Sequence, residues 1–419
     1  MNTTVTIERL GALGDGIATV GGKPVYVEGA LPGEVVEIDD QFPRPTLLDI
    51  TSPSPDRVTP DCPYFEACGG CVAQHMPPAI YRNWKRSTIE TAFTLEAIEI
   101  SLSDTLESPV GSRRRAVFSA EFVQGKLRFG FSARRSHDLA DIRECLVLDP
   151  EITSNLNGLK ELAGVLIQQG ERLRVSVLAS QSGLDVSISD SGTVSRDARL
   201  KAINHAISMN WARLTVEDEV FVETRAPILS PGGCDVVPPP GGFSQATKAA
   251  EDQMVELVLG HLGKSRHAID LFSGFGTFSL PLAEHSRVHA VELEGAALAN
   301  LETAARSLPG LKPVTIEQRD LFRRPVLADE LKPFDFAVID PPRAGAEAQT
   351  KALAKSSINR IAFVSCNPTT LARDAEILLD AGFGLEKLIP IDQFLYSAHV
   401  ELVAHFSRKK ARKRPSIFG

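Results

Sequence analysis

The first fifty residues alternate short apolar runs with glycine-rich turns. The stretch VTIERLGALGDGIATVGGKPVYVEGALPGEVVEIDD has β-type alternation and no helical period of useful length. This pattern predicts a small β-barrel over residues 1–53. The segment that follows, TSPSPDRVTPDCP, is rich in Pro, Ser and Asp, which is typical of a linker or loop.

A second β-rich region follows a segment with helical spacing at residues 76–100. From Arg113 to about Pro227, runs such as RRRAVFSAEF and RLRVSVLA alternate apolar and polar positions, and one helix is predicted near residues 150–169. We therefore predict a central, mainly β domain over residues 54–235. The Pro- and Gly-rich stretch SPGGCDVVPPPGGF marks its end.

Beyond this boundary, apolar runs alternate with helical segments. The runs HAIDLF, VHAVEL, FDFAVID and RIAFVS have the pattern of a parallel sheet built from βαβ units. This pattern predicts an α/β, Rossmann-like domain over residues 236–407. A basic tail is expected over residues 408–419.

The length and composition are those of an ordinary globular protein. A chain of 419 residues suggests about two or three domains. The N-terminus MNTTVTIERL has no signal-peptide pattern and no apolar stretch is long enough to span a bilayer, so we expect a cytoplasmic protein without membrane contact. The six cysteines are then expected to be reduced thiols, metal ligands or catalysts. The net charge of −8 restricts any nucleic-acid contact to local basic patches.

A glycine turn lies between the first strand and helix of the predicted α/β domain. Gly274 and Gly276 let a ligand approach the backbone, although a tight structural turn is an alternative reading. Glu292 ends the next strand, about 20 residues after Asp270, where an acid can hold ribose hydroxyls. Ser279 replaces the third glycine of the dinucleotide fingerprint, which favours a nucleoside ligand without a pyrophosphate, such as S-adenosylmethionine.

Three more chemically active residues end later strands. Asp320 follows the third strand, Asp340 the fourth and Cys366 the fifth, at the edge where open α/β sheets bind their ligands. Asp340 is also compatible with a capped Asp-Pro turn, and Cys366 with a small buried apolar residue.

A methyltransferase needs a thiol when the acceptor carbon is electron-poor, as C5 of uracil is. A thiolate that adds to C6 makes C5 nucleophilic, and a base must later remove the C5 proton. The stretch FLYSAHVELVAHF supplies Glu401 and His399 as candidate bases. Glu401 is also compatible with the start of a solvated strand.

The motifs DLFSGFGTFSLPLA, DPPRAGA, VSCNPTTLARD and HVELV together resemble the RNA 5-methyluridine methyltransferases. The resemblance covers essentially the whole chain and implies a class I S-adenosylmethionine-dependent fold for residues 236–407. It implies that Cys366 is the nucleophile and Glu401 the base, and that Gln245 of FSQAT helps to hold the cofactor or the uracil. The residues assigned to the cofactor site are Gln245, Phe272, Gly274, Gly276, Glu292, Asp320 and Asp340.

Two positions depart from the pattern of the family. Thr247 stands where F-x-Q-x-N would have Asn, and QFLYSAH replaces a Phe-Pro-His-Thr-type segment before the base. Neither departure touches the nucleophile, but both affect contacts around the substrate and cofactor.

A second group of cysteines lies near the front of the chain. Cys62, Cys68 and Cys71 form C-x₅-C-x₂-C, and Cys145 follows much later. The spacing alone leaves open an iron–sulfur Cys₄ site or a zinc site with His75 as fourth ligand. The resemblance favours a [4Fe–4S] cluster on the four cysteines, because a subset of the family carries one on this motif. Cys234 is expected to be structural.

The same subset carries an N-terminal TRAM domain, an RNA-binding β-barrel that GDGIATVGGKPVYVEGALPGE resembles. Members with both features typically act on 23S ribosomal RNA, so the expected partner is ribosomal RNA first and tRNA second, with no obligate protein partner. The cluster of Arg113, Arg114 and Arg115 is the expected phosphate-binding patch, with a solvated charged face as the alternative.

Two other functions stay open on the sequence. A methyltransferase acting on an exocyclic nitrogen also suits the D-P-P motif but needs no thiol. A noncatalytic iron–sulfur protein that binds RNA or senses redox state would use the front cysteines and leave the methyltransferase motifs idle.

Overall fold

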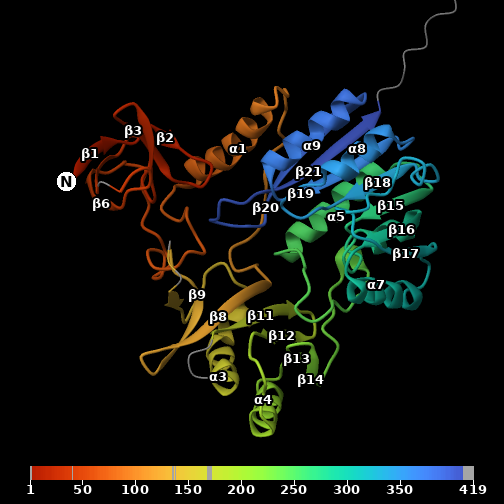
Figure 1. Ribbon diagram of the computed structural model, residues 1–419, viewed down its shortest axis with the longest axis horizontal. Coiled ribbons are helices and arrows are strands. Elements are labelled where there is room, and N and C mark those ends of the chain that lie inside the picture. Colours follow the sequence, from red (N-terminus) through yellow and green to blue (C-terminus); the bar gives the residue numbers. More distant parts are fainter. Residues whose placement is uncertain (1, 40, 135, 137, 168–171, 409–419) are drawn as a thin grey trace, which may run out of the picture.

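The computed structural model describes residues 2–39, 41–134, 136, 138–167 and 172–408. Figure 1 shows three parts, which are the small N-terminal strands beside helix α1, a central sheet, and a larger sheet between helices in the C-terminal half. Apart from Arg408, the predicted basic tail lies outside the described residues.

The N-terminal strands form two three-stranded antiparallel sheets with a shared core. One sheet contains β1 (Thr3–Thr6), β5 (Val35–Ile38) and β6 (Leu47–Ser52), and the other β2 (Arg9–Leu10), β3 (Gly16–Val20) and β4 (Lys23–Val27). The buried residues between them are Val5, Ile7, Ala18, Val25, Val27, Ala30, Val36 and Ile38. These sheets confirm the predicted N-terminal β fold.

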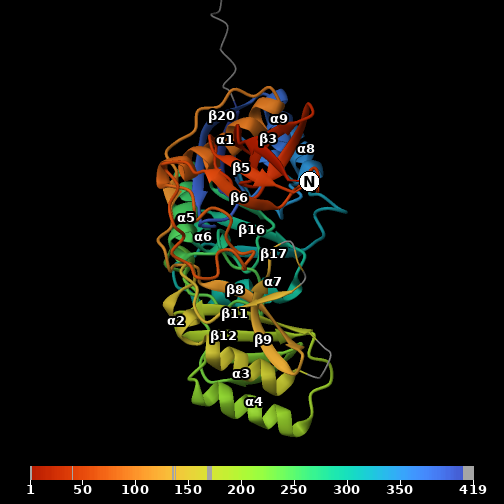
Figure 2. The same cartoon turned by 90° about the vertical axis from the view of Figure 1, so that its left-hand side faces the viewer.

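The central sheet has the order β10-β9-β8-β11-β12-β13-β14. Its strands are β8 (Arg115–Val123), β9 (Lys126–Ser132), β10 (Leu139–Asp141), β11 (Arg172–Ser180), β12 (Gly183–Ser189), β13 (Arg213–Val216) and β14 (Glu219–Glu223). The helices are α2 (Pro150–Ser154), α3 (Leu156–Leu166) and α4 (Arg196–Ser208). In Figure 2, α3 and α4 lie on the same side of this sheet, where their apolar residues close its core.

The C-terminal sheet has the order β17-β16-β15-β18-β19-β21-β20-β7. Its strands are β15 (His267–Leu271), β16 (Arg287–Glu292), β17 (Val314–Gln318), β18 (Phe336–Ile339), β19 (Arg360–Ser365), β20 (Phe383–Asp392) and β21 (Glu401–Arg408). The helices are α5 (Lys248–Leu262), α6 (Ser279–His285), α7 (Gly295–Ser307), α8 (Glu347–Lys355) and α9 (Pro368–Asp380), and Pro231–Gly233 forms a short 3₁₀ turn. Strands β15 to β19 run parallel, and β21 pairs antiparallel with both β19 and β20.

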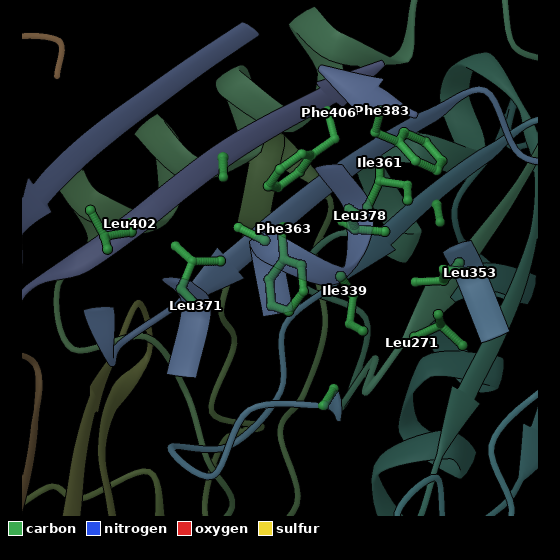
Figure 3. Packing of buried hydrophobic residues seen from close by; sticks show 14 of the residues in the cluster. Leu271, Ile339, Leu353, Ile361, Phe363, Leu371, Leu378, Phe383, Leu402 and Phe406 are labelled. Atoms are coloured by element: carbon green, nitrogen blue, oxygen red, sulfur yellow. The ribbon is translucent and has the colours of Figure 1, made fainter. Parts of the chain in front are cut away.

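Burial on both faces explains why these strands are continuous apolar runs. Every residue of β18 and all but the first of β19 are buried. Figure 3 shows Phe363 and Ile361 of β19 beside Phe406 and Leu402 of β21, with Leu371 of α9 packed against them. The Rossmann-like α/β prediction is confirmed.

Helix α1 (Pro78–Leu95) and strand β7 (Leu106–Glu107) belong to this C-terminal sheet and its core. Ile89 and Phe93 of α1 pack in the same buried cluster as Leu378 of α9. Helix α1, which lies within the predicted 54–235 domain, thus buries part of its apolar face against the C-terminal sheet. No described helix is both long enough and apolar enough to cross a membrane.

Candidate active site

The carboxyl ends of β15, β16, β18 and β19 meet at one edge of the C-terminal sheet. The glycine turn follows β15, Glu292 ends β16, Asp340 follows β18 and Cys366 follows β19. Since parallel strands present the same end to the same edge, the sheet brings together residues from four separate motifs.

The glycine turn is open on one side and tightly packed on the other. Gly274 has φ +55°, and a Cβ added there would meet no atom within 4 Å. A Cβ on Gly276 would lie 2.4 Å from Cδ1 of Leu301, so close packing of α7 requires glycine there. Phe272, two residues before Gly274, also has a positive φ of 63°. The turn therefore leaves room for a ligand at Gly274.

The Glu292 carboxylate fixes this turn. One of its oxygens accepts from the Gly274 amide at 3.0 Å, and the other from the amides of Leu293 at 2.7 Å and Glu294 at 3.0 Å. Glu292 thus links the ends of β15 and β16 at the place where the sequence predicts ribose binding.

Asp270 is an acid that our sequence analysis did not assign to the site. It is fully buried at the end of β15, its Oδ2 accepts from Oγ of Ser279 at 2.6 Å, and its Oδ1 has no partner. Burial raises the pKa of Asp270 to about 7, and the charges of Asp340 and Glu292 add to the rise. The sequence signal that could have identified Asp270 is an acid at the end of the strand before the glycine turn. The site therefore has an excess of carboxyl groups, which suits a cationic ligand.

Antiparallel pairing places Glu401 beside Cys366. Ser365 of β19 pairs with Leu402 of β21, so Cys366 and Glu401 are the next residues on the two strands. Burial raises the pKa of the Cys366 thiol to about 12, the charges of Glu401 and Asp340 add to the rise, and Arg343 opposes it. The free thiol is therefore protonated at neutral pH.

The two carboxyl groups near this thiol also have raised pKa values. Glu401 is 3% exposed, and burial raises its pKa well above the usual range, with a further rise from Asp340. Burial likewise raises the pKa of Asp340 to about 7, although a hydrogen bond from Gln245 lowers it. Both carboxyl groups are stronger bases than exposed ones.

Two glutamines connect these carboxyl groups. Gln245 donates from Nε2 to Oδ2 of Asp340 at 3.1 Å. Gln393 donates from Nε2 to Oε2 of Glu401 at 2.7 Å and to Oε1 of Gln245 at 2.9 Å. Our sequence analysis predicted Gln245 but did not select Gln393, which lies in the QFLYSAH segment that departs from the family pattern.

Thr247, the other departure, has a structural role here. Its Oγ1 accepts from the Ala250 amide at 3.1 Å and thereby caps α5, and it also bonds Oγ of Ser108 at 3.0 Å. Threonine retains the N-cap function at this position.

Asp320 and His399 lie at the margins of the site. Asp320 follows β17, and its Oδ1 accepts from the amides of Phe322 at 3.0 Å and Arg323 at 3.2 Å. The half-exposed Phe322 ring lies 5.5 Å from that of Phe272, so an aromatic pair borders the glycine turn. Burial and nearby cations lower the pKa of His399. Glu401 is among the groups that shift the pKa of Cys366.

The front cysteines border one cavity of about 290 Å³. Cys62, Cys68, Cys71 and Cys145 all line it, and Cys71 interacts electrostatically with the other three. Within the described residues, no group of three or more His, Cys, Asp or Glu side chains is arranged to hold a metal ion. The iron–sulfur assignment therefore stays a prediction.

His75 and Cys234, the other residues considered with the cysteines, lie in different surroundings. His75, the alternative zinc ligand, is 1% exposed, and neither of its ring nitrogens has a hydrogen-bond partner among the residues that the structure describes. It is not among the residues that line the thiol cavity. Cys234 is buried in the apolar cluster beside α6 and α7, with its Sγ 3.8 Å from Oε1 of Glu284.

Two contacts tie the cysteine loop to the rest of the molecule. Arg134 donates to the carbonyls of Cys68 at 3.2 Å and Cys71 at 2.6 Å, and pairs with Glu28 of the N-terminal sheets at 2.7 Å. The Tyr396 carbonyl, five residues before Glu401, accepts from the Val72 and Ala73 amides at 2.8 and 3.2 Å. The loop thus contacts the segment that leads to the candidate base.

The three consecutive arginines are held in different ways. Arg114 is buried and pairs with Glu251 at 2.5 Å, while its Nε donates to the Gln245 carbonyl at 3.2 Å. These contacts favour a structural role for Arg114. The Arg113 guanidinium lies over the Phe394 ring, and that of Arg115 lies over the exposed Phe243 ring at 5.6 Å. Phosphate contact by the arginines stays a prediction.

The comparisons with known proteins agree with this geometry. Residues 239–409 match the family model described as tRNA (Uracil-5-)-methyltransferase, and residues 3–39 match the TRAM domain. A protein of Agrobacterium fabrum named as an uncharacterized RNA methyltransferase is 45% identical, and the match covers 96% of this chain and 98% of that protein. A 23S rRNA (uracil(1939)-C(5))-methyltransferase of Pectobacterium atrosepticum is 32% identical, with 97% and 93% covered.

Among solved structures, the tRNA (uracil-54, C5)-methyltransferase of Pyrococcus abyssi in complex with S-adenosyl-L-homocysteine has a TM-score of 0.74. It is 21% identical, and the match covers 96% of this chain and 99% of that one, so it shows a shared fold. Together with the matches in sequence, this fold identifies the chain as a member of the RNA (uracil-5-)-methyltransferase family.

Proposed function

We propose that this enzyme methylates C5 of a uridine in 23S ribosomal RNA through a covalent adduct between Cys366 and C6 of the base. The observation that carries the proposal is the pairing of β19 with β21, which sets the Cys366 thiol beside the buried Glu401 carboxyl. A methyltransferase acting on an exocyclic nitrogen would not need this thiol.

The proposed reaction begins when the Cys366 thiol gives its proton to the neighbouring Asp340 carboxylate and Sγ bonds to C6, so that the C5=C6 electron pair moves onto C5 and the C4 carbonyl. S-adenosylmethionine supplies the methyl group from its sulfonium, and S-adenosylhomocysteine is the leaving group. Glu401 then takes the C5 proton, the electron pair re-forms C5=C6, and the thiolate leaves C6. A carboxylate with a raised pKa is suited to this proton transfer.

We propose that the acidic groups around the glycine turn form the cofactor site. Asp270, Glu292 and Asp340 provide negative charge for the sulfonium and ammonium of the methyl donor. The open space at Gly274 lets the methyl donor lie against the backbone of the turn. Phe272 and Phe322 offer aromatic faces beside the turn. Asp320 orders the loop that carries Phe322.

We propose ribosomal RNA rather than tRNA as the substrate because one relative is named as a 23S rRNA methyltransferase. The match with that relative covers almost the full length of both proteins. The N-terminal TRAM match supplies an RNA-binding element. For the RNA path we propose Arg115 with the exposed Phe243, an arrangement that suits phosphate contact and base stacking. The target base has to leave its stack to reach Cys366.

We further propose that Cys62, Cys68, Cys71 and Cys145 hold a [4Fe–4S] cluster. The support is the cavity that all four of these cysteines line. A tetrahedral zinc ion with Zn–S bonds near 2.3 Å would draw its thiols to about 3.8 Å from one another, whereas a cluster is ligated at its outer corners and needs room. The cluster would order the loop that contacts Tyr396.

The test is methyl transfer from labelled S-adenosylmethionine to unmodified ribosomal RNA and tRNA, with identification of the product nucleoside. We expect 5-methyluridine in ribosomal RNA with the wild-type enzyme and none with Cys366→Ala. Methylation of tRNA alone would reassign the substrate. Unchanged methylation by Cys366→Ala would overturn the covalent mechanism.

A further inference from the structure

Gln393 is a buried amide between the two halves of the active site. It follows β20 directly and is 2% exposed. Its side chain makes three hydrogen bonds, with the Ala246 amide, Gln245 and Glu401. Gln393 therefore contacts the backbone next to Gln245 and the side chains of both Gln245 and Glu401.

The bond to the backbone fixes the orientation of this amide. The Ala246 N–H can only donate, so the group 2.9 Å away must be Oε1 of Gln393. Nε2 then points the other way, and its two hydrogens are used by Oε2 of Glu401 and Oε1 of Gln245. Since its Oε1 accepts, Gln245 presents Nε2 to Asp340. One backbone amide thus orients two side-chain amides.

We propose that Gln393 is a positioning residue that aligns Glu401 for removal of the C5 proton and locks Gln245 in the orientation that binds Asp340. The inference rests on the proposed role of Glu401 as the base. Because Oε2 of Glu401 is occupied by the Gln393 N–H, Oε1 is the oxygen that receives the proton. The hydrogen bonds that run from Asp340 through Gln245 and Gln393 to Glu401 form a relay, which connects the two carboxyl groups near Cys366.

The relay has an electrostatic consequence. A hydrogen bond donated to a carboxylate stabilises its charged form, and the bond from Gln393 lowers the pKa of Glu401 against the rise caused by burial. Removing the donor raises that pKa further. Because the base must be ionised, the acid limb of the kcat profile then moves to higher pH.

The experiment compares Gln393→Met with Gln349→Met. Gln349 is a matched control, since it is 1% exposed and its amide bonds both backbone groups of Val326, away from the site. For Gln393→Met we expect kcat at neutral pH to fall by about 10²-fold with little change in KM. We also expect an acid limb at higher pH and more denaturation-resistant adduct between protein and RNA. Gln349→Met should lower the melting temperature without moving the pH profile.

A wild-type pH profile and no extra adduct in Gln393→Met would overturn the inference. If Gln393→Met melts below the assay temperature, Gln393→Asn is measured instead, because its side chain is one methylene too short to reach the Ala246 amide and Glu401 together, and the same two readouts apply. Wild-type enzyme and Cys366→Ala in the same assay separate the failure of this inference about Gln393 from the failure of the proposed function. Loss of wild-type 5-methyluridine formation, or its persistence without the thiol, contradicts the proposed function itself.

Discussion

Cys366 and the four front cysteines have different surroundings, although burial raises the pKa of Cys366 and of Cys68, Cys71 and Cys145. Cys366 is a single thiol at the end of a parallel strand, beside the carboxyl groups of Glu401 and Asp340. The front cysteines lie on loops and line one cavity together with Arg113.

The difference shows that the neighbours of a thiol, more than the thiol itself, determine its chemistry. Carboxyl groups beside Cys366 can accept and return protons, which a covalent cycle requires. The front thiols have other thiols and guanidinium groups as neighbours, an environment that suits a bound anionic cluster. The following predictions test this contrast.

Removing the Cys366 thiol should have the largest effect. With Cys366→Ala, methyl transfer is expected to fall on the order of 10⁴-fold or more, because the adduct at C6 cannot form. The measurement is incorporation of labelled methyl into RNA, with the melting temperature as a control for folding. Cys234→Ala is the matched variant, since that cysteine lies in a separate apolar cluster, and it should retain activity.

Glu401→Gln should come next. The C5 proton then stays on the methylated base, so turnover is expected to fall about 10²- to 10⁴-fold while a covalent complex of RNA and protein accumulates. A denaturing gel with labelled RNA measures the complex. His399→Asn is the comparison, and accumulation in that variant instead would transfer the base role to His399.

Substitution of a front cysteine should give a smaller loss of activity. For Cys145→Ser we expect protein purified without oxygen to lose iron and sulfide and methyl transfer to fall at least about tenfold, because the loop that contacts Tyr396 loses its order. Iron, sulfide and zinc analysis checks this. Zinc without sulfide in the wild-type protein would exclude the proposed cluster, and Cys234→Ser should keep the metal.

The smallest effect concerns the titration of Cys366. Glu401 is a negative neighbour that raises the pKa of this thiol, so Glu401→Gln should lower it and speed alkylation at a fixed pH. The expected gain is about tenfold for each unit by which the thiol pKa falls. Iodoacetamide labelling read by peptide mass spectrometry measures the rate at Cys366. An unchanged rate would mean that Glu401 is already protonated in the free enzyme.

The sequence by itself determined the fold class and the edge of the sheet that carries the chemistry. Gly274, Glu292, Asp340 and Cys366 each stand at the end of an apolar run, and the rule for parallel strands suffices to bring them together. The sequence also allowed a strand to start at Glu401, but as a solvated one, whereas Glu401 begins β21 and is 3% exposed. Such features depend on local patterns and on one topological rule.

Only the tertiary structure decided which distant residues meet. Gln245 and Gln393 are 148 positions apart, and they meet because β20 runs in the same direction as β19, with the antiparallel β21 between them, and so ends at the edge of the sheet that carries the site. Arg114, which reads as a surface cation, is paired with the buried Glu251. Helix α1 packs on the catalytic sheet. These contacts depend on how segments far apart in the chain pack together. Desolvation and hydrogen-bond geometry decide that packing, and the local pattern of apolar and polar residues does not predict it.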